Sequence, residues 1–441
     1  MTSELAPVQL AIDLTTDLDR YEEDRDVIRH TLRVGSLEIE SEVPTPADSD
    51  CSPLAVWWRA YLRGSRPRAI SPLGGSLHIA DLFSGAGGLT LGARQVALEL
   101  GLRPVVELVA DVDAEAVEVY AANHDVRNRS VQSVKSLLDY SIRVASGGSS
   151  FLYPPEILND DLMRSTSRID VILAGPPCQG HSNLNNHSRR EDPRNSLYLT
   201  VPAFAVAVGA PICIVENVPS VVHDYKDVVT IAQQLFESEG YFVETGVLSA
   251  SDMGWPQTRK RHFMIARRDA NPLPLVELAS IVRKPRPLSA WWAIGDLVGI
   301  ESAKAIDQVT DLSPENRARI DWLFDNDAYD LDLPERPPSH QNGTSYMSVY
   351  GRMKKDEPAQ TITTGFMSPG RGRYVHPTER RVITPHEAAR LQGFPDDYEF
   401  EVDPTNPPTR ARLAKWIGDA VPMPLGYAAT LSALAAGPPT D

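Results

Sequence analysis

The stretch from Leu77 to Leu100 constrains the fold more than any other part of the sequence. An apolar run, LHIADLF, leads directly into a glycine-rich turn, SGAGG, and then into LTLGARQVALEL, whose apolar residues recur at helical spacing. A buried strand that turns through glycines into a helix brings backbone amides close to a ligand, as nucleotide sites require. We therefore expect a strand, a ligand-binding turn and a helix in this order.

Further apolar runs follow along the chain and are separated by helical or polar sequence. They lie at 105–111, 170–174, 212–216, 241–248 and 262–266. Alternation of strands and helices predicts an α/β fold with a doubly wound, mostly parallel sheet covered by helices on both faces.

Composition excludes several other classes of protein. The 441 residues are 42% hydrophobic and 23% charged, which are ordinary values for a globular chain and exclude fibrous or wholly disordered readings. No apolar run approaches the roughly 18 residues of a membrane helix, and the N-terminus is acidic where a signal peptide is basic. The three cysteines are too far apart for a disulfide framework or a CxxC zinc site. We expect a cytoplasmic protein with no membrane contact and no metal.

The charge is unevenly distributed. Of a formal net charge of −16, residues 1–50 carry 13 acidic residues against four arginines. We interpret this segment as a solvated extension or a partner-docking arm, with an autoinhibitory DNA mimic as the alternative. Basic residues elsewhere gather in three groups that leave local positive faces for phosphate: Arg189, Arg190 and Arg194; Arg259, Lys260, Arg261, Arg267 and Arg268; Arg371, Arg373, Arg380 and Arg381.

Changes in pattern predict four parts of the chain. Residues 1–52 form the acidic N-terminal extension, and residues 53–268 hold the glycine turn and the alternating strands. Residues 269–345 are rich in proline and break the alternation, which predicts a smaller second domain. Residues 346–441 return to the first domain.

Polar residues at the ends of the predicted strands are the candidate site. The turn has Thr90 where a dinucleotide fingerprint needs its third glycine, so a nicotinamide oxidoreductase is disfavoured. Asp111 ends the next strand, where a carboxylate can accept hydrogen bonds from ribose hydroxyls. Cys178 follows another strand and two prolines, which suits a nucleophile, whereas Cys213 lies inside an apolar run and reads as a core residue.

Three charged residues complete the candidates. Glu216 follows four apolar residues, and a carboxylate at a buried strand end forms an ion pair or serves a ligand. Arg259 and Arg261 are two residues apart on an extended segment and therefore point to one face.

These motifs together resemble a known family. DLFSGAGG, GPPCQGHS, ENV, QTRKR, RLQGFPDDY and GDAVPMPLGYA, in this order between Leu77 and Ala428, resemble the motifs of the DNA (cytosine-5) methyltransferases of bacterial restriction-modification or phage-defence systems. The resemblance implies a class I S-adenosylmethionine-dependent methyltransferase fold, with the target-recognition domain in the segment 269–345. The cofactor implied is S-adenosyl-L-methionine.

The resemblance also assigns roles to individual residues. It implies that Phe83, Gly85 and Gly87 cradle the methionine part of the cofactor, that Asp111 holds the ribose, and that Asp161, or else Asp160, contacts the adenine. The further cofactor contacts that it implies are Asp81, Val112, Pro176, Leu197, Asp419 and Val421.

The implied reaction needs a nucleophile and a proton donor. Cytosine C5 is a poor nucleophile, so a Cys178 thiolate adds to C6, and a protonated Glu216 donates to N3 as negative charge develops on the ring. Arg261 is expected at the base O2 and Arg259 in support of the catalytic loop. The cytosine must leave the duplex to reach these groups. After methyl transfer to C5, a base, of which water is one candidate, removes the C5 proton and the thiolate leaves.

One departure and two rival functions remain. The family's GNAVP motif is Gly418-Asp419-Ala420-Val421-Pro422 here, which adds a carboxylate near the cofactor region. The rivals are a tRNA cytosine-5 methyltransferase and a non-catalytic DNA-binding homologue. We expect a monomer that acts on double-stranded DNA beside a cognate nuclease or other defence proteins.

Overall fold

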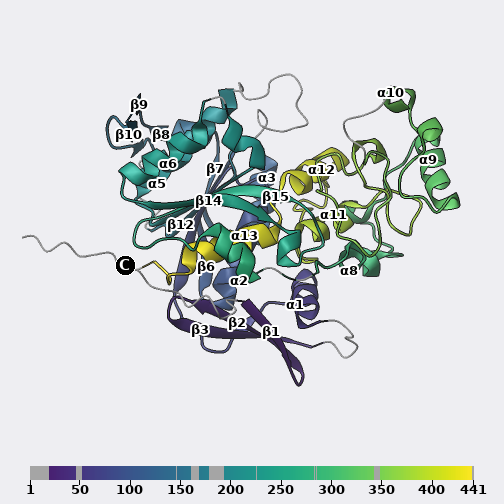
Figure 1. The fold of residues 1–441 in the computed structure, drawn as a ribbon, viewed down its shortest axis with the longest axis horizontal. Coiled ribbons are helices and arrows are strands. Elements are labelled where there is room, and N and C mark those ends of the chain that lie inside the picture. The colour runs from purple at the N-terminus through teal and green to yellow at the C-terminus, as the bar shows by residue number, and fades with distance from the viewer. Residues whose placement is uncertain are drawn as a thin grey trace, which may run out of the picture.

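The computed structural model describes residues 19–45, 52–145, 147–159, 168–177, 193–224, 226–282, 284, 286–341 and 348–439. Figure 1 shows a large part built around a central sheet, a smaller lobe that carries α8 to α11 beside it, and a separate N-terminal sheet below. Among the described residues, no helix has the length and apolar character needed to cross a membrane.

A seven-stranded sheet forms the centre of the large part. Its order is β14-β15-β13-β12-β5-β6-β7, and β15 alone runs antiparallel to its neighbours. The strands are β5 (Ser76–Leu82), β6 (Arg103–Asp111), β7 (Val126–Val131), β12 (Val171–Ala174), β13 (Ile212–Asn217), β14 (Phe242–Ser249) and β15 (Lys260–Arg267). The prediction of a mostly parallel α/β sheet is confirmed.

Helices cover both faces of this sheet. Side chains from α2 (Gly88–Glu99), α7 (Leu275–Val282) and α13 (Met423–Leu434) share a core with one face, and those from α5 (Thr200–Val208) and α6 (Val228–Ser238) share a core with the other. Helix α3 (Ala114–Asn123) packs beside β6. Short strands in the segment between β7 and β12 pair as hairpins: β8 (Leu138–Asp139), β9 (Ile142–Ala145), β10 (Gly148–Phe151) and β11 (Glu156–Ile157).

Helices α2 and α13 approach each other closely at Gly92. A Cβ added at Gly92 would lie inside the contact distance of the Tyr427 backbone nitrogen and within 2.6 Å of the Met423 carbonyl oxygen. Backbone atoms cannot move aside as a side chain can, so we expect Gly92→Ala to lower the free energy of unfolding by about 2–3 kcal/mol. Urea unfolding measures this loss. Gly147→Ala is the control, because its Cβ would meet nothing within 4 Å, and an equal loss in both variants would contradict the account.

The smaller lobe has a separate core only around α9, whereas α8, α11 and α12 contribute buried residues to the main core. Its helices are α8 (Ala290–Ile294), α9 (Pro314–Asp325), α10 (Pro338–Gln341), α11 (Pro385–Gln392) and α12 (Arg410–Asp419), of which α12 lies at the junction (Figure 1). Ile320 and Leu323 of α9 pack with Val375 and Val382, while Leu275 packs into the core of the large part. The contacts of the lobe therefore cross both expected boundaries, 269 and 345.

The described part of the acidic segment is not a solvated arm. It forms three antiparallel strands, β1 (Asp19–Asp24), β2 (Val27–Val34) and β3 (Leu37–Pro44), to which β4 (Arg68–Ala69) adds. Alternate residues, including Ile28 and Leu32, are buried in the main core with α1 (Pro53–Leu62). The interpretation as a solvated extension is wrong for these residues, because the acidic side chains occupy mainly the outer positions of the alternation.

A network of buried charges fastens this sheet to the large part. His30, which is fully buried, has Nε2 2.6 Å from Asp19 Oδ1 and Nδ1 3.3 Å from Glu99 Oε2 on α2. Lys284 Nζ lies 3.0 Å from Asp19 Oδ2, and the Tyr427 hydroxyl on α13 donates to Glu99 at 2.6 Å. The network therefore joins β1 and β2 to two helices and to the segment after α7.

The network makes stability depend on pH. Burial alone would lower the pKa of His30, but the carboxylates of Glu99 and Asp19 raise it to about 9 from 6.5. Folding therefore takes up a proton, and the stabilisation is complete below pH 6.5 and lost as the pH rises through 9. We expect the wild type to lose roughly 2–3 kcal/mol of unfolding free energy over this range beyond the loss in His30→Gln. If the unfolding free energies of the two proteins, measured in urea, changed with pH by the same amount, the assignment would be refuted.

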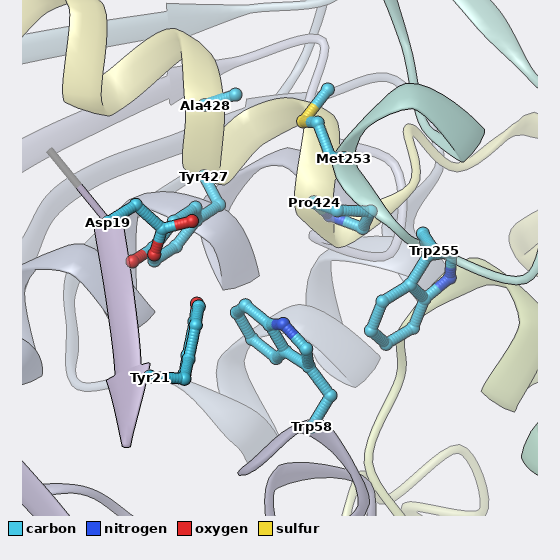
Figure 2. Close-up of a pocket in the computed structure, with 8 residues that line it drawn as sticks. All are labelled: Asp19, Tyr21, Trp58, Met253, Trp255, Pro424, Tyr427 and Ala428. Carbon is cyan, nitrogen blue, oxygen red and sulfur yellow. The ribbon is translucent and has the colours of Figure 1, made fainter. Parts of the chain in front are cut away.

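A small cavity lies beside the network. Figure 2 shows its lining, in which Tyr21 and Trp58 from the N-terminal part face Trp255 and Tyr427 from the large part, with Asp19 at one side. Its space of about 20 Å³ is room for about one water molecule. The N-terminal sheet is thus packed onto the large part with almost no gap.

Candidate active site

The carboxyl ends of β5, β6, β12 and β13 bring the predicted site residues to one edge of the sheet. These strands run parallel, so the residues that follow them meet there. A Cβ added at Gly175, just after β12, would lie 3.8 Å from both Glu216 Oε2 and the Phe83 carbonyl oxygen. The strand ends that carry the glycine turn, the cysteine loop and Glu216 are therefore direct neighbours.

The glycine turn after β5 has an unusual backbone. Phe83, Gly85 and Gly87 have φ angles of 58°, 51° and 84°, and left-handed φ at a non-glycine residue such as Phe83 costs energy that is often found at ligand sites. The turn is tied to the end of β6, because Asp111 accepts hydrogen bonds from the backbone N–H of Gly85 and Asp113, both at 2.9 Å. Asp111 therefore lies beside the turn, at the carboxyl end of β6.

Asp81 lies beneath the turn and is 1% exposed. It accepts a hydrogen bond of 2.6 Å from the Thr90 hydroxyl, which is 2.8 Å from the Tyr120 hydroxyl. Burial raises its pKa to about 7, against the Thr90 hydrogen bond, which lowers it. The Asp81 side chain thus joins the end of β5 to the first residues of α2.

The other predicted cofactor residues differ in exposure. Val112, next to Asp111, is 72% exposed, and Leu197 is half-buried on a short helix, Pro193–Leu199. Val421 is buried against the start of α2, where its carbonyl lies close to Gly88. Asp419, which replaces the family's Asn, is exposed and lies 3.3 Å from Lys415 Nζ.

Glu216 and Arg261 form a close pair at the end of β13. Arg261 Nε lies 2.7 Å from Glu216 Oε1, and both side chains are largely buried. Burial raises the pKa of Glu216, while the charges of Arg261 and Arg259 act in the opposite direction. Because burial dominates, the site favours a neutral carboxyl more than water does.

Arg259 makes different contacts from those of Arg261. It is 4% exposed, and its guanidinium donates to the carbonyls of Ile362 at 2.6 Å and Gly418 at 2.9 Å. Arg259 therefore joins β15 to two segments of the C-terminal part, one of which is the Gly418–Pro422 motif.

Asn217 is a residue that our sequence analysis did not single out. Its Nδ2 donates to the Pro176 carbonyl at 3.1 Å, and its Oδ1 accepts from the Val218 N–H at 2.8 Å. Pro176 precedes Cys178 by two residues, so Asn217 holds the described segment that leads toward the cysteine. A polar amide at the end of an apolar strand was the available signal. Cys178 and Asp161 themselves lie outside the described residues, as do Arg189 and Arg190.

Residues 77–433 of the chain match the C-5 cytosine-specific DNA methylase family. The chain belongs to this family. This methylase is 35% identical over 435 residues to the Type II methyltransferase M1.BsuMI of Bacillus subtilis (strain 168), with 97% of each chain covered. It is 27% identical to the Type II methyltransferase M.DdeI of Desulfomicrobium norvegicum, covering 80% of this chain and 87% of that one.

Solved structures share the fold of the methylase. A putative DNA modification methyltransferase encoded in an E. coli prophage superposes with a TM-score of 0.53 at 23% identity and covers 81% of this chain and 98% of its own. The S. pombe Dnmt2 methyltransferase gives a TM-score of 0.53 at 16% identity, with 82% and 98% covered. The predicted class I methyltransferase fold is confirmed, and the enzyme is a DNA cytosine-5 methyltransferase.

The N-terminal sheet of the methylase precedes the family match, which begins at residue 77. The alignment with the B. subtilis relative covers 97% of the chain and therefore includes most of this segment. The sequence of this sheet is thus aligned with that of at least one relative, although it lies outside the residues that match the family.

Three of the arginines that we expected at DNA phosphates form ion pairs within the smaller lobe of the methylase. Arg373 lies 2.6 Å from Asp330, Arg380 lies 2.6 Å from Asp325, and Arg381 makes a two-pronged contact with Glu387 at 2.7 and 2.8 Å. Each guanidinium is paired with a carboxylate of the same lobe, which leaves less positive charge for phosphate than the sequence suggests.

Proposed function

We propose that this methylase transfers the methyl group of S-adenosyl-L-methionine to C5 of a cytosine flipped out of a specific duplex sequence. The observation that carries the proposal is the Glu216–Arg261 pair, held 2.7 Å apart beside the loop that leads to Cys178. In cytosine the ring atom N3 and the carbonyl O2 are neighbours. A protonated Glu216 and the Arg261 guanidinium would be two adjacent hydrogen-bond donors, which match N3 and O2 on that edge of the base.

The residues around the glycine turn fit S-adenosylmethionine. Asp111 supplies a carboxylate for ribose hydroxyls, and the exposed Val112 beside it offers an apolar surface for a base ring. The left-handed backbone at Gly85 and Gly87 permits close approach of a ligand. When bound, the cofactor supplies an electrophilic methyl group on a positively charged sulfur. We assign Asp161 to the adenine, and Leu197 and Pro176 to further contacts, on the family resemblance.

The residues of the chain divide the work on the base. The Cys178 thiolate adds to C6, which moves electrons toward N3 and makes C5 nucleophilic. Glu216, in its protonated form, donates to N3 as the negative charge develops, and burial of the carboxyl favours that form. Arg261 donates to O2. After C5 has gained the methyl group, a base removes the C5 proton, the electron pair re-forms the C5–C6 double bond, the thiolate leaves, and N3 returns its proton to Glu216.

The biological setting follows from the relatives. The B. subtilis and D. norvegicum proteins are named Type II methyltransferases, which supports a role in restriction-modification beside a cognate nuclease. We further assign target recognition to the smaller lobe, in which the region around α9 has a core separate from that of the sheet domain. We propose that a monomer acts on double-stranded DNA.

The first experiment measures transfer of a labelled methyl group from S-adenosylmethionine to duplex DNA and, in parallel, to tRNA. Incorporation into DNA alone is the expected result. Incorporation into tRNA alone would replace the proposal with the RNA-modifying rival, and cofactor binding without transfer to either would favour the non-catalytic homologue.

A further inference from the structure

Tyr398 connects the segment after α11 to the glycine turn. It is buried, and its hydroxyl donates to the Ala86 carbonyl at 2.5 Å, across 312 residues of sequence. Burial raises the pKa of Tyr398 well above the ordinary range of a phenol, so the hydroxyl keeps its proton and remains a donor. The bond reaches the middle of the turn, between the left-handed Gly85 and Gly87.

The space around Gly87 is closed by the same tyrosine. A Cβ added at Gly87 would lie 2.9 Å from the Tyr398 hydroxyl oxygen, 2.9 Å from a Tyr120 ring carbon and 3.0 Å from His124 Nε2. Burial lowers the pKa of His124 to about 3, so its ring is neutral and adds no charge beneath the turn. The rings of Tyr398, Tyr120 and His124 thus pack against the turn at Gly87.

Tyr398 is itself held firmly. The neighbouring Glu399 exchanges two hydrogen bonds with the Asn123 side chain at the end of α3, at 2.9 Å from Nδ2 to the Glu399 carbonyl and 2.7 Å from the Glu399 N–H to Oδ1. The Tyr398 ring also packs on Phe394 and Phe400, with centroids 4.9 and 5.1 Å away. The hydroxyl therefore has a fixed position relative to α3.

The peptide between Ala86 and Gly87 is hydrogen-bonded at both its N–H and its carbonyl. Glycine adopts positive and negative φ at similar cost, so the φ of 84° at Gly87 is not enforced by the residue itself. The Gly87 N–H bonds to the Ser84 carbonyl at 3.0 Å within the turn, and Tyr398 holds the carbonyl at the other end of the same peptide. Without the hydroxyl, the Ala86 carbonyl loses this bond, and we expect the turn to be held less firmly.

We propose that Tyr398 is a positioning residue that fixes the backbone of the glycine turn for binding of S-adenosylmethionine. The inference rests on the proposed function, because it concerns affinity for that cofactor. It also links the segment that follows α11 in the C-terminal part of the chain to cofactor binding, although that segment lies outside the turn and the strands that carry the site.

The test compares two tyrosine variants by calorimetric titration with S-adenosylmethionine. Tyr398→Phe removes only the hydroxyl, and we expect the dissociation constant to rise five- to tenfold. Tyr241→Phe is the matched control, because this buried tyrosine also donates to a backbone carbonyl, that of Ala210, at 2.6 Å. It lies among the residues of α5 and α6, so we expect a similar drop in melting temperature with unchanged affinity.

A second variant approaches the same segment through different atoms. Asn123→Ala removes both bonds to Glu399, and we expect a rise of two- to threefold in the dissociation constant. Equal affinities of Tyr398→Phe, Asn123→Ala and wild type, with melting temperatures lowered as in Tyr241→Phe, would overturn the inference alone. Absence of binding by the wild type would instead overturn the proposed function.

Discussion

Replacement of Cys178 by alanine is expected to lower the rate of methyl transfer on the order of 10⁴-fold, because alanine has no group that can add to C6. Without that bond, C5 of cytosine stays a poor nucleophile however well the base and the cofactor are held. Binding of S-adenosylmethionine should change little, since the glycine turn and Asp111 are built on other strands. The measurement is a single-turnover assay together with a binding titration.

Cys213→Ala is the matched control for this prediction. Cys213 is fully buried in β13, and burial raises the pKa of its thiol well above the ordinary range. It is therefore inert as a nucleophile, and its replacement should cost stability but not the chemical step. Equal activity of Cys178→Ala and Cys213→Ala would exclude Cys178 as the nucleophile.

Glu216→Gln is expected to lower the rate about 10²- to 10³-fold, because an amide cannot deliver a proton to N3 as charge develops on the ring. The variant keeps the shape of the side chain beside Arg261, so affinity for the cofactor should be retained. Single-turnover rates as a function of pH measure the effect. The wild-type rate should fall as the pH rises through the raised pKa of Glu216, since only the protonated carboxyl donates, and this limb should be missing from Glu216→Gln.

Glu107→Gln separates catalysis from stability. Glu107 is also fully buried on a strand of the same sheet, and it pairs with Arg127 at 2.9 Å. Its replacement should destabilise the fold without changing the pH profile of the reaction. If Glu216→Gln also lost stability but kept the wild-type pH profile, the Glu216–Arg261 pair would be structural.

The sheet and the location of the site could be predicted because each motif stands at the end of an apolar run. The runs before Phe83, Asp111, Gly175 and Glu216 became four adjacent parallel strands, β5, β6, β12 and β13, so their ends had to meet at one edge. Chemistry-bearing residues at that edge are visible in the sequence by position alone. The roles of Glu216 and Arg261 stay predictions, as does that of Cys178.

The N-terminal sheet could not be predicted from charge. The number of acidic residues predicts a solvent-exposed segment. In the structure, however, Ile28, His30 and Leu32 alternate with more exposed residues and place one face of β2 in the core. Buried His30 is paired with Asp19 and with Glu99 on α2, and Asp19 is paired in turn with Lys284, far away in the sequence. Composition records how many charges a segment has and not which side of a strand they occupy.

Tyr398 and Asn217 escaped the sequence analysis for a different reason. Both act through backbone carbonyls, those of Ala86 and Pro176, and a carbonyl has no sequence signature. Arg373 and Arg380 show the converse, because their sequence suggests a phosphate surface while their carboxylate partners, Asp330 and Asp325, lie 43 and 55 residues away in the sequence. Pairing between distant segments is the information that a motif lacks.

The most direct test of the central claim is identification of the modified base in DNA treated with the enzyme and S-adenosylmethionine, by nucleoside mass spectrometry followed by conversion sequencing. The account predicts 5-methylcytosine at one defined duplex sequence. Methyl groups on N4 of cytosine or on N6 of adenine, or DNA left without 5-methylcytosine while the protein binds the cofactor, would contradict it.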